Sequence, residues 1–218
     1  MTELIVALDT TDMSEAESMA EELKGSVGAF KVGLTLLASY GPDAIDVLRS
    51  YGPIFADVKY HDIPEQIRLA SRALSHRQVW MFTVHSSGGE AMVRAAVEGA
   101  RNGRAKPIVA GVTVLTSLSA TDLDRVGQGG DLERQTVHLA EQVTSWGATA
   151  VVSPGQLIKP VRNVVGDTVP IVVPGVRPVG VAAGDQSSVV TPEMAARDGA
   201  DYIVVGRPIT KATDPARA

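Results

Sequence analysis

Short apolar runs alternate with amphipathic segments along the whole chain. Eight of these runs have the length of buried strands, at residues 4–8, 29–33, 54–60, 81–85, 107–115, 149–153, 171–173 and 202–205. The segments between them carry apolar residues at helical spacing, and we predict helices at 14–23, with Ser14 as its cap, at 64–77 and at 90–101. Gly41-Pro42 divides the helical stretch 36–51, and glycines within 127–130 divide the one that ends at residue 146.

This alternation predicts an α/β protein with a closed (β/α)8 barrel, a TIM barrel, in which residues 1–218 form a single domain. The alternative is an open doubly wound sheet. However, no G-x-G-x-x-G motif follows the first strand, and charged residues gather at several strand ends, where a barrel has its active site. Only residues 208–218 follow the last strand, so we expect the closing helix to be very short or absent.

Composition narrows the class of protein. The 218 residues are 44% hydrophobic and 21% charged, as in an ordinary soluble domain, and 20 basic against 25 acidic residues give a net charge of −5. Without a basic block or a long apolar stretch, we expect neither a nucleic-acid partner nor a membrane span. The chain has no cysteine, which excludes disulfides and thiolate chemistry, and its first strand leaves no room for a signal peptide, so we expect a cytoplasmic protein.

Charged residues stand near the carboxyl ends of the first three strands. Asp9 follows the run 4–8, and Lys31 lies in the second strand. Asp57 and Lys59 share one face of an extended third strand because side chains alternate with period two, and Asp62 follows them. Charges at the ends of buried strands are costly unless they pair. We therefore predict one shared site built from these five residues.

Glycine and arginine recur at the ends of the last two strands. The seventh strand runs into Pro174-Gly175-Val176-Arg177-Pro178, and the eighth ends in Gly206-Arg207-Pro208. In a barrel these two loops are neighbours, so glycine N–H groups and two guanidinium groups could grip a phosphate. The glycine- and alanine-rich loop 179–184 is long enough to act as a lid over such a site.

These motifs together resemble one family, the orotidine 5'-phosphate decarboxylases, over essentially the whole chain. The resemblance rests on the segments 7–9, 30–33, 57–64, 112–117, 174–178, 184–186 and 204–209. It implies a homodimer with shared active sites that converts orotidine 5'-monophosphate to uridine 5'-monophosphate in pyrimidine synthesis. It also implies an enzyme that uses neither a metal nor a cofactor.

The resemblance assigns roles to the charged residues. Lys59 matches the lysine that protonates C6 of the pyrimidine, and Asp57 matches the aspartate beside the substrate carboxylate. Asp9 and Lys31 match residues that hold the ribose and orient the charged set. Asp62 matches a residue that reaches across the dimer into the neighbouring site.

Other positions are expected to bind the nucleotide. Arg177, Gln186, Gly206 and Arg207 match the family's phosphate grip. A hydroxyl after the fifth strand contacts the pyrimidine, and both Thr116 and Ser119 remain candidates for it. Ile63 and Gln66 belong to the same nucleotide-binding set, although Gln66 stands where the family commonly has a threonine, which implies a changed contact and not a lost activity.

Two rival functions share parts of this pattern. A sister group, which decarboxylates 3-keto-L-gulonate 6-phosphate with magnesium or makes hexulose phosphate, has the same D-x-K-x-x-D frame. Its members carry a metal-binding glutamate where this chain has Lys31, and a lysine repels magnesium. The other rival is a non-catalytic nucleotide-binding barrel. The complete charged set argues against it, because binding alone does not require costly paired charges.

Overall fold

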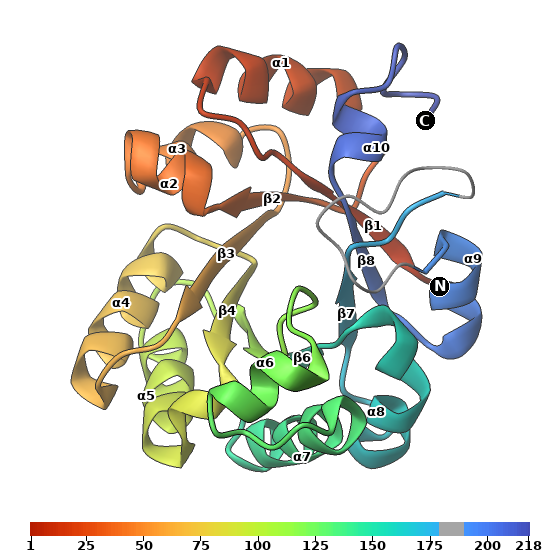
Figure 1. Cartoon of the computed structure of the whole chain (residues 1–218). Coiled ribbons are helices and arrows are strands. Elements are labelled where there is room, and N and C mark those ends of the chain that lie inside the picture. The colour runs from red at the N-terminus through yellow and green to blue at the C-terminus, as the bar shows by residue number, and fades with distance from the viewer. Residues whose placement is uncertain (179–189) are drawn as a thin grey trace.

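The computed structural model describes residues 1–178 and 190–218, and its eight parallel strands close into a barrel in sequence order (Figure 1). The strands are β1 (Glu3–Ala7), β2 (Ala29–Gly33), β3 (Ile54–Tyr60), β4 (Met81–His85), β5 (Ile108–Val112), β6 (Ala150–Val152), β7 (Ile171–Pro174) and β8 (Tyr202–Val205). The barrel closes where β8 pairs with β1, with Ile5 opposite Val204. The (β/α)8 prediction is therefore confirmed, and the open doubly wound sheet is wrong.

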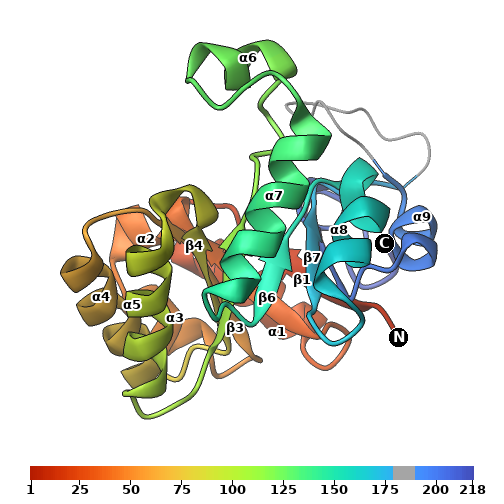
Figure 2. The same cartoon turned by 90° about the horizontal axis from the view of Figure 1, so that it is seen from below.

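Helices surround the barrel on its outside (Figure 1). They are α1 (Met13–Leu23), α2 (Leu34–Tyr40), α3 (Asp43–Leu48), α4 (Pro64–His76), α5 (Glu90–Arg101), α6 (Ala120–Arg125), α7 (Leu132–Ser145), α8 (Ile158–Val165), α9 (Pro192–Asp198) and α10 (Arg207–Thr210), with short 3-10 turns η1 (Ser86–Gly88) and η2 (Gly155–Leu157). The two predicted divisions are confirmed: Gly41-Pro42 separates α2 from α3, and residues 126–131 separate α6 from α7. Figure 2 shows α6 standing beyond the rest of the helical ring, joined to α7.

Some boundaries differ from the sequence-based expectation. Asp12, not Ser14, caps α1, because its side chain accepts a hydrogen bond of 2.8 Å from the Ser14 N–H. The fifth strand ends at Val112 and not at Leu115. The very short closing helix is confirmed as α10, which buries Ile209 and is followed by an ion pair between Lys211 and Glu15 of α1. The predicted lid, 179–184, lies outside the described residues.

The core has two layers, because successive strand residues point to opposite sides of the barrel wall. Val6, Phe30 and Ile54 pack outward against the helices. Ile5, Phe55 and Met81 belong to a separate buried cluster inside the barrel. The interior of the barrel is therefore packed by side chains, as far as the described residues show. Within the described residues, no helix is both long and apolar enough to cross a membrane.

One arginine ties together the amino ends of β7 and β8. Arg162 of α8 donates hydrogen bonds to the carbonyl oxygens of Gly166, Val169 and Gly199, at 2.6 to 2.8 Å. It also pairs with Asp201 at 2.6 Å, and the same Asp201 oxygen accepts the N–H of Ile171, the first residue of β7. The side chain of Arg162 is only 16% exposed, so water cannot replace these contacts easily.

Replacing this arginine should destabilise the barrel. Arg162→Met should lower the free energy of unfolding by about 2 to 3 kcal/mol, because three carbonyls and Asp201 lose a charged donor. Urea titration followed by circular dichroism measures the change. The control is Arg94→Met, which breaks only an exposed pair with Glu90 and should cost less than about 1 kcal/mol. Equal effects of the two substitutions would contradict a clamping role for Arg162.

Candidate active site

A cavity of about 460 Å³ opens at the carboxyl ends of the strands. All eight strands or the residues directly after them contribute to its wall, which includes Asp9, Lys31, Asp57, Lys59, Thr83, Val112, Thr116, Val152, Ser153, Pro174, Arg177, Val204, Gly206 and Arg207. Because parallel strands all end on the same side of a barrel, residues far apart in the sequence meet here.

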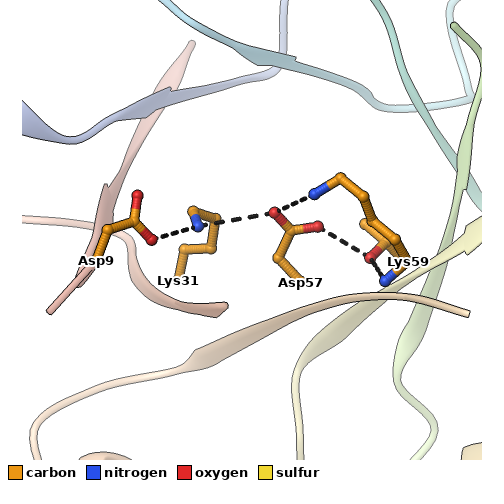
Figure 3. Close-up of polar contacts among 5 residues, drawn as sticks. Asp9, Lys31, Asp57 and Lys59 are labelled. Atoms are coloured by element: carbon orange, nitrogen blue, oxygen red, sulfur yellow. Dashed lines mark hydrogen bonds and ion pairs between the residues drawn. The ribbon is translucent and has the colours of Figure 1, made fainter. Parts of the chain in front are cut away.

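Four charged side chains form a continuous line across the cavity, which we call the charged row (Figure 3). Lys31 Nζ lies 2.9 Å from Asp9 Oδ1 and 3.7 Å from Asp57 Oδ2. Lys59 Nζ lies 2.7 Å from the same Asp57 oxygen. Negative and positive groups thus alternate along the row, which brings together four of the five residues predicted to share one site.

The Asp57 carboxyl lies at the centre of the row and its side chain is only 14% exposed. Burial raises its pKa, but the ammonium groups of Lys31 and Lys59 and hydrogen bonds from Lys59 and Thr83 lower it further than burial raises it. Because its pKa is held below the usual value, Asp57 is ionised at neutral pH. The row therefore presents two carboxylates and two ammonium groups to a ligand.

The third strand brings Lys59 to the row through a bulge. Ala56 pairs with Phe82 and Tyr60 pairs with Val84, so three residues of β3, 57 to 59, stand opposite the single residue Thr83. The backbone of Lys59 has φ +46°, in the left-handed region that residues other than glycine rarely adopt. The sequence predicted that Asp57 and Lys59 share one face of a regular strand. Their side chains do meet, but the backbone that brings them together is a bulge and not a regular strand.

The two predicted loop arginines, which follow β7 and β8, also line the cavity. Arg177 is 7% exposed, and its Nε has no hydrogen-bond partner among the described residues. Arg207 and Gly206 line the same cavity. A buried guanidinium N–H without a partner is costly, so its position at the cavity favours an anionic ligand. Gln186 lies outside the described residues.

The two candidate hydroxyl residues after β5 lie in different surroundings. Thr116 lines the cavity, together with apolar side chains of Val114 and Leu115. Ser119 caps α6: its hydroxyl and its N–H both bond to the Asp122 carboxylate, which holds the pKa of that carboxyl below its usual range. Among the described residues the cavity wall includes Thr116 and not Ser119.

The chain is similar to known proteins along its whole length. A profile of the Orotidine 5'-phosphate decarboxylase / HUMPS family matches residues 2–218. The chain belongs to this family. It is 45% identical to orotidine 5'-phosphate decarboxylase of Anaeromyxobacter sp. (strain K), over 99% of this chain and 94% of that protein. It is 43% identical to the protein of the same name from Heliobacterium modesticaldum, over 99% and 91%.

A solved structure of the family shares the fold. The crystal structure of orotidine 5'-phosphate decarboxylase from Lactobacillus acidophilus superposes with a TM-score of 0.86 at 33% sequence identity. The match covers 100% of this chain and 95% of that one. The family resemblance seen in the sequence motifs is therefore confirmed over the whole barrel.

Three residues that the family resemblance assigned to the site do not line this chain's own cavity. Asp62, Ile63 and Gln66 are exposed at the start of α4. The Asp62 carboxylate accepts a hydrogen bond of 2.6 Å from the Ile63 N–H. Ile63 has 64% of its surface exposed, which is unusual for a large apolar side chain.

One residue that lines the cavity was not predicted from the sequence. Thr83 lines the cavity and hydrogen-bonds to Asp57 and to the backbone of Lys59. A threonine inside an apolar strand is ordinary, so the residue type alone did not indicate a role in the site. Its position two residues before the end of β4, on the cavity side, was the only available hint.

The lowered pKa of Asp57 predicts an acid-dependent loss of stability. A carboxyl whose folded pKa is depressed stabilises the fold above its unfolded pKa of about 4, and this contribution is lost as the pH falls below it. Asp57→Asn removes the titration. The free energy of unfolding of wild type minus that of the variant should therefore decrease between pH 5 and pH 3. Urea titrations at several pH values measure it, and parallel curves for the two proteins would contradict the assignment.

Proposed function

We propose that this protein decarboxylates orotidine 5'-monophosphate to uridine 5'-monophosphate, the reaction named for its relatives. The observation that carries the proposal is the charged row at the end of the cavity, in which Lys59 Nζ lies 2.7 Å from Asp57. The buried Arg177, which lines the same cavity, supports binding of the substrate phosphate.

The chemistry of the reaction requires a cation beside one carbon atom. When the C6–carboxylate bond breaks, its electron pair stays on C6 of the pyrimidine, where resonance gives little relief. The Lys59 ammonium stabilises this charge and then donates a proton to C6, so that the product is uridine 5'-monophosphate and neutral CO2. Solvent then returns a proton to Lys59.

Asp57 has two effects in this proposal. It holds Lys59 in place, and it faces the substrate carboxylate. Two carboxylates about 4 Å apart repel by about 4 kcal/mol at an effective dielectric constant of about 20, and departure as neutral CO2 relieves this repulsion. Stabilisation of the transition state by Lys59 supplies the larger part, since only an interaction that strengthens during the reaction accelerates it.

Lys31 supports the metal-independent reaction over the magnesium-dependent one of the sister group. Its ammonium lies between the carboxylates of Asp9 and Asp57, at 2.9 and 3.7 Å. The sister group has its metal-binding glutamate at this position, and a fixed positive charge there opposes binding of magnesium. We propose that Lys31 and Asp9 hold the ribose hydroxyls and keep Asp57 oriented.

We further propose a homodimer with shared active sites. The support is that Asp62 and Ile63 are exposed and lie outside their own cavity, although they belong to the motif 57–64 that carries the family resemblance. Gln66, two residues beyond this motif, is also exposed and outside the cavity. The exposed Ile63 gives this segment an apolar contact for a second copy. The cytoplasmic location stays a prediction.

Purified protein should decarboxylate orotidine 5'-monophosphate at the same rate with and without excess EDTA. The loss of substrate absorbance in the ultraviolet measures the rate. The reason is that Lys59 and Lys31 supply the cations on which the reaction depends. Loss of turnover with EDTA that magnesium restores would favour the sister group, and a folded, phosphate-binding protein without any turnover would favour a non-catalytic barrel.

Mixing two inactive variants should restore activity if the sites are shared. Lys59→Ala and Asp62→Ala should each reduce turnover to a small fraction of wild type as homodimers. In a mixed dimer one site collects both changes and the other receives an intact Lys59 from one chain and an intact Asp62 from the other. With random exchange about half the dimers are mixed, so about a quarter of wild-type activity should return.

The complementation needs a control for subunit exchange. Two differently tagged chains, mixed under the same conditions and separated by affinity, report whether mixed dimers form. If they form and no activity appears, Asp62 serves the site of its own chain and the shared-site proposal is wrong.

A further inference from the structure

We propose that Thr83 is a positioning residue, whose hydroxyl fixes the bulge of β3 and thereby aims Lys59 and Asp57 at the substrate. The inference deepens the proposed decarboxylase function and rests on it for its kinetic part. Its structural part concerns only contacts within this chain.

The Thr83 hydroxyl makes two hydrogen bonds at once. Its oxygen accepts the backbone N–H of Lys59 at 2.8 Å, and its O–H donates to Asp57 Oδ1 at 3.0 Å. A hydroxyl has a single proton, so donating to Asp57 leaves its lone pairs to face Lys59. The side chain is 1% exposed, and water therefore does not compete for either contact.

The hydrogen bond from the Lys59 N–H to Thr83 takes the place of a backbone hydrogen bond between β3 and β4. Across the bulge, four steps of β3 from Ala56 to Tyr60 match two steps of β4 from Phe82 to Val84. The Lys59 N–H therefore bonds to the Thr83 side chain in place of a backbone carbonyl. A left-handed φ at a lysine is costly and persists only when its surroundings hold it. Here the hydrogen bond from the Lys59 N–H to the Thr83 hydroxyl holds the lysine backbone in this conformation.

The second bond sets the rotation of the Asp57 carboxylate. Oδ2 faces both lysines, at 2.7 Å from Lys59 and 3.7 Å from Lys31, while Oδ1 is held by Thr83. Without the hydroxyl, the carboxylate could turn and one ammonium would lose its partner. Thr83 thus positions the backbone of the proton donor and the carboxylate that holds its side chain.

A structural test uses the amide proton of Lys59 and does not depend on any reaction. Thr83→Ser and Thr83→Ala both lose the methyl group and differ only in the hydroxyl. The proposal predicts that exchange of the Lys59 amide with solvent deuterium, followed by NMR, is at least ten-fold faster in the alanine variant than in the serine variant. Thr83→Val, which keeps the shape, should resemble alanine. Equal exchange in the serine and alanine variants would overturn the proposal.

A kinetic test separates positioning from general support of the fold. Thr83→Ala and Thr83→Val should lower kcat about ten- to a hundred-fold with KM changed less than about three-fold, because a hydrogen bond to a charged group is lost while the binding groups remain. Thr83→Ser should restore kcat to within about three-fold of wild type. Unchanged kcat in the alanine and valine variants, or a failure of serine to restore it, would overturn the proposal.

Thr113 supplies the matched control. It is also buried, at 4% exposed, and its hydroxyl donates to the Val152 carbonyl at 2.8 Å, but it does not touch the charged row. Thr113→Val should leave kcat within about three-fold of wild type; a loss equal to that of Thr83→Val would count against positioning. If wild type itself fails to decarboxylate orotidine 5'-monophosphate, the proposed function fails, and the amide exchange still decides the role of Thr83.

Discussion

The site depends on one shared carboxylate oxygen. Asp57 Oδ2 lies 2.7 Å from one ammonium and 3.7 Å from another, in a cavity where its side chain is 14% exposed. Two lysines at such a place would repel each other without it, and a lone carboxylate would be driven to protonate. The carboxylate and the two cations therefore stabilise one another's charge.

The barrel makes that arrangement rigid. The strand ends that carry the row belong to neighbouring strands, β1, β2 and β3, whose backbones are hydrogen-bonded in register. Below the row the interior is closed by Phe55 and Met81. Gly33 leaves room above Lys31: a Cβ at that glycine would lie 3.0 Å from Nζ. The charges are thus fixed before a ligand arrives, which is the condition for electrostatic stabilisation of a transition state.

Much of this could be predicted from the sequence, because strand periodicity and strand-end charges are local signals. Such signals predict the barrel, the charged residues Asp9, Lys31, Asp57 and Lys59 at its mouth, and the arginines Arg177 and Arg207 in the same cavity. The bulge does not, since it arises from the pairing of β3 with β4, and Thr83 acquires its partners only there. Likewise Thr116 and Ser119 could not be separated, because the capping bond between Ser119 and Asp122 depends on where α6 begins.

In the reaction that we propose, the Lys59 cation at the end of the charged row performs the chemical step. Lys59→Met tests it most directly, because methionine keeps much of the length of the side chain and removes its charge and proton. Binding of uridine 5'-monophosphate, measured by calorimetry, verifies that the variant's cavity is intact. We expect this variant to bind the product nucleotide and to release no CO2 from orotidine 5'-monophosphate above the background rate. Turnover near that of wild type would contradict it.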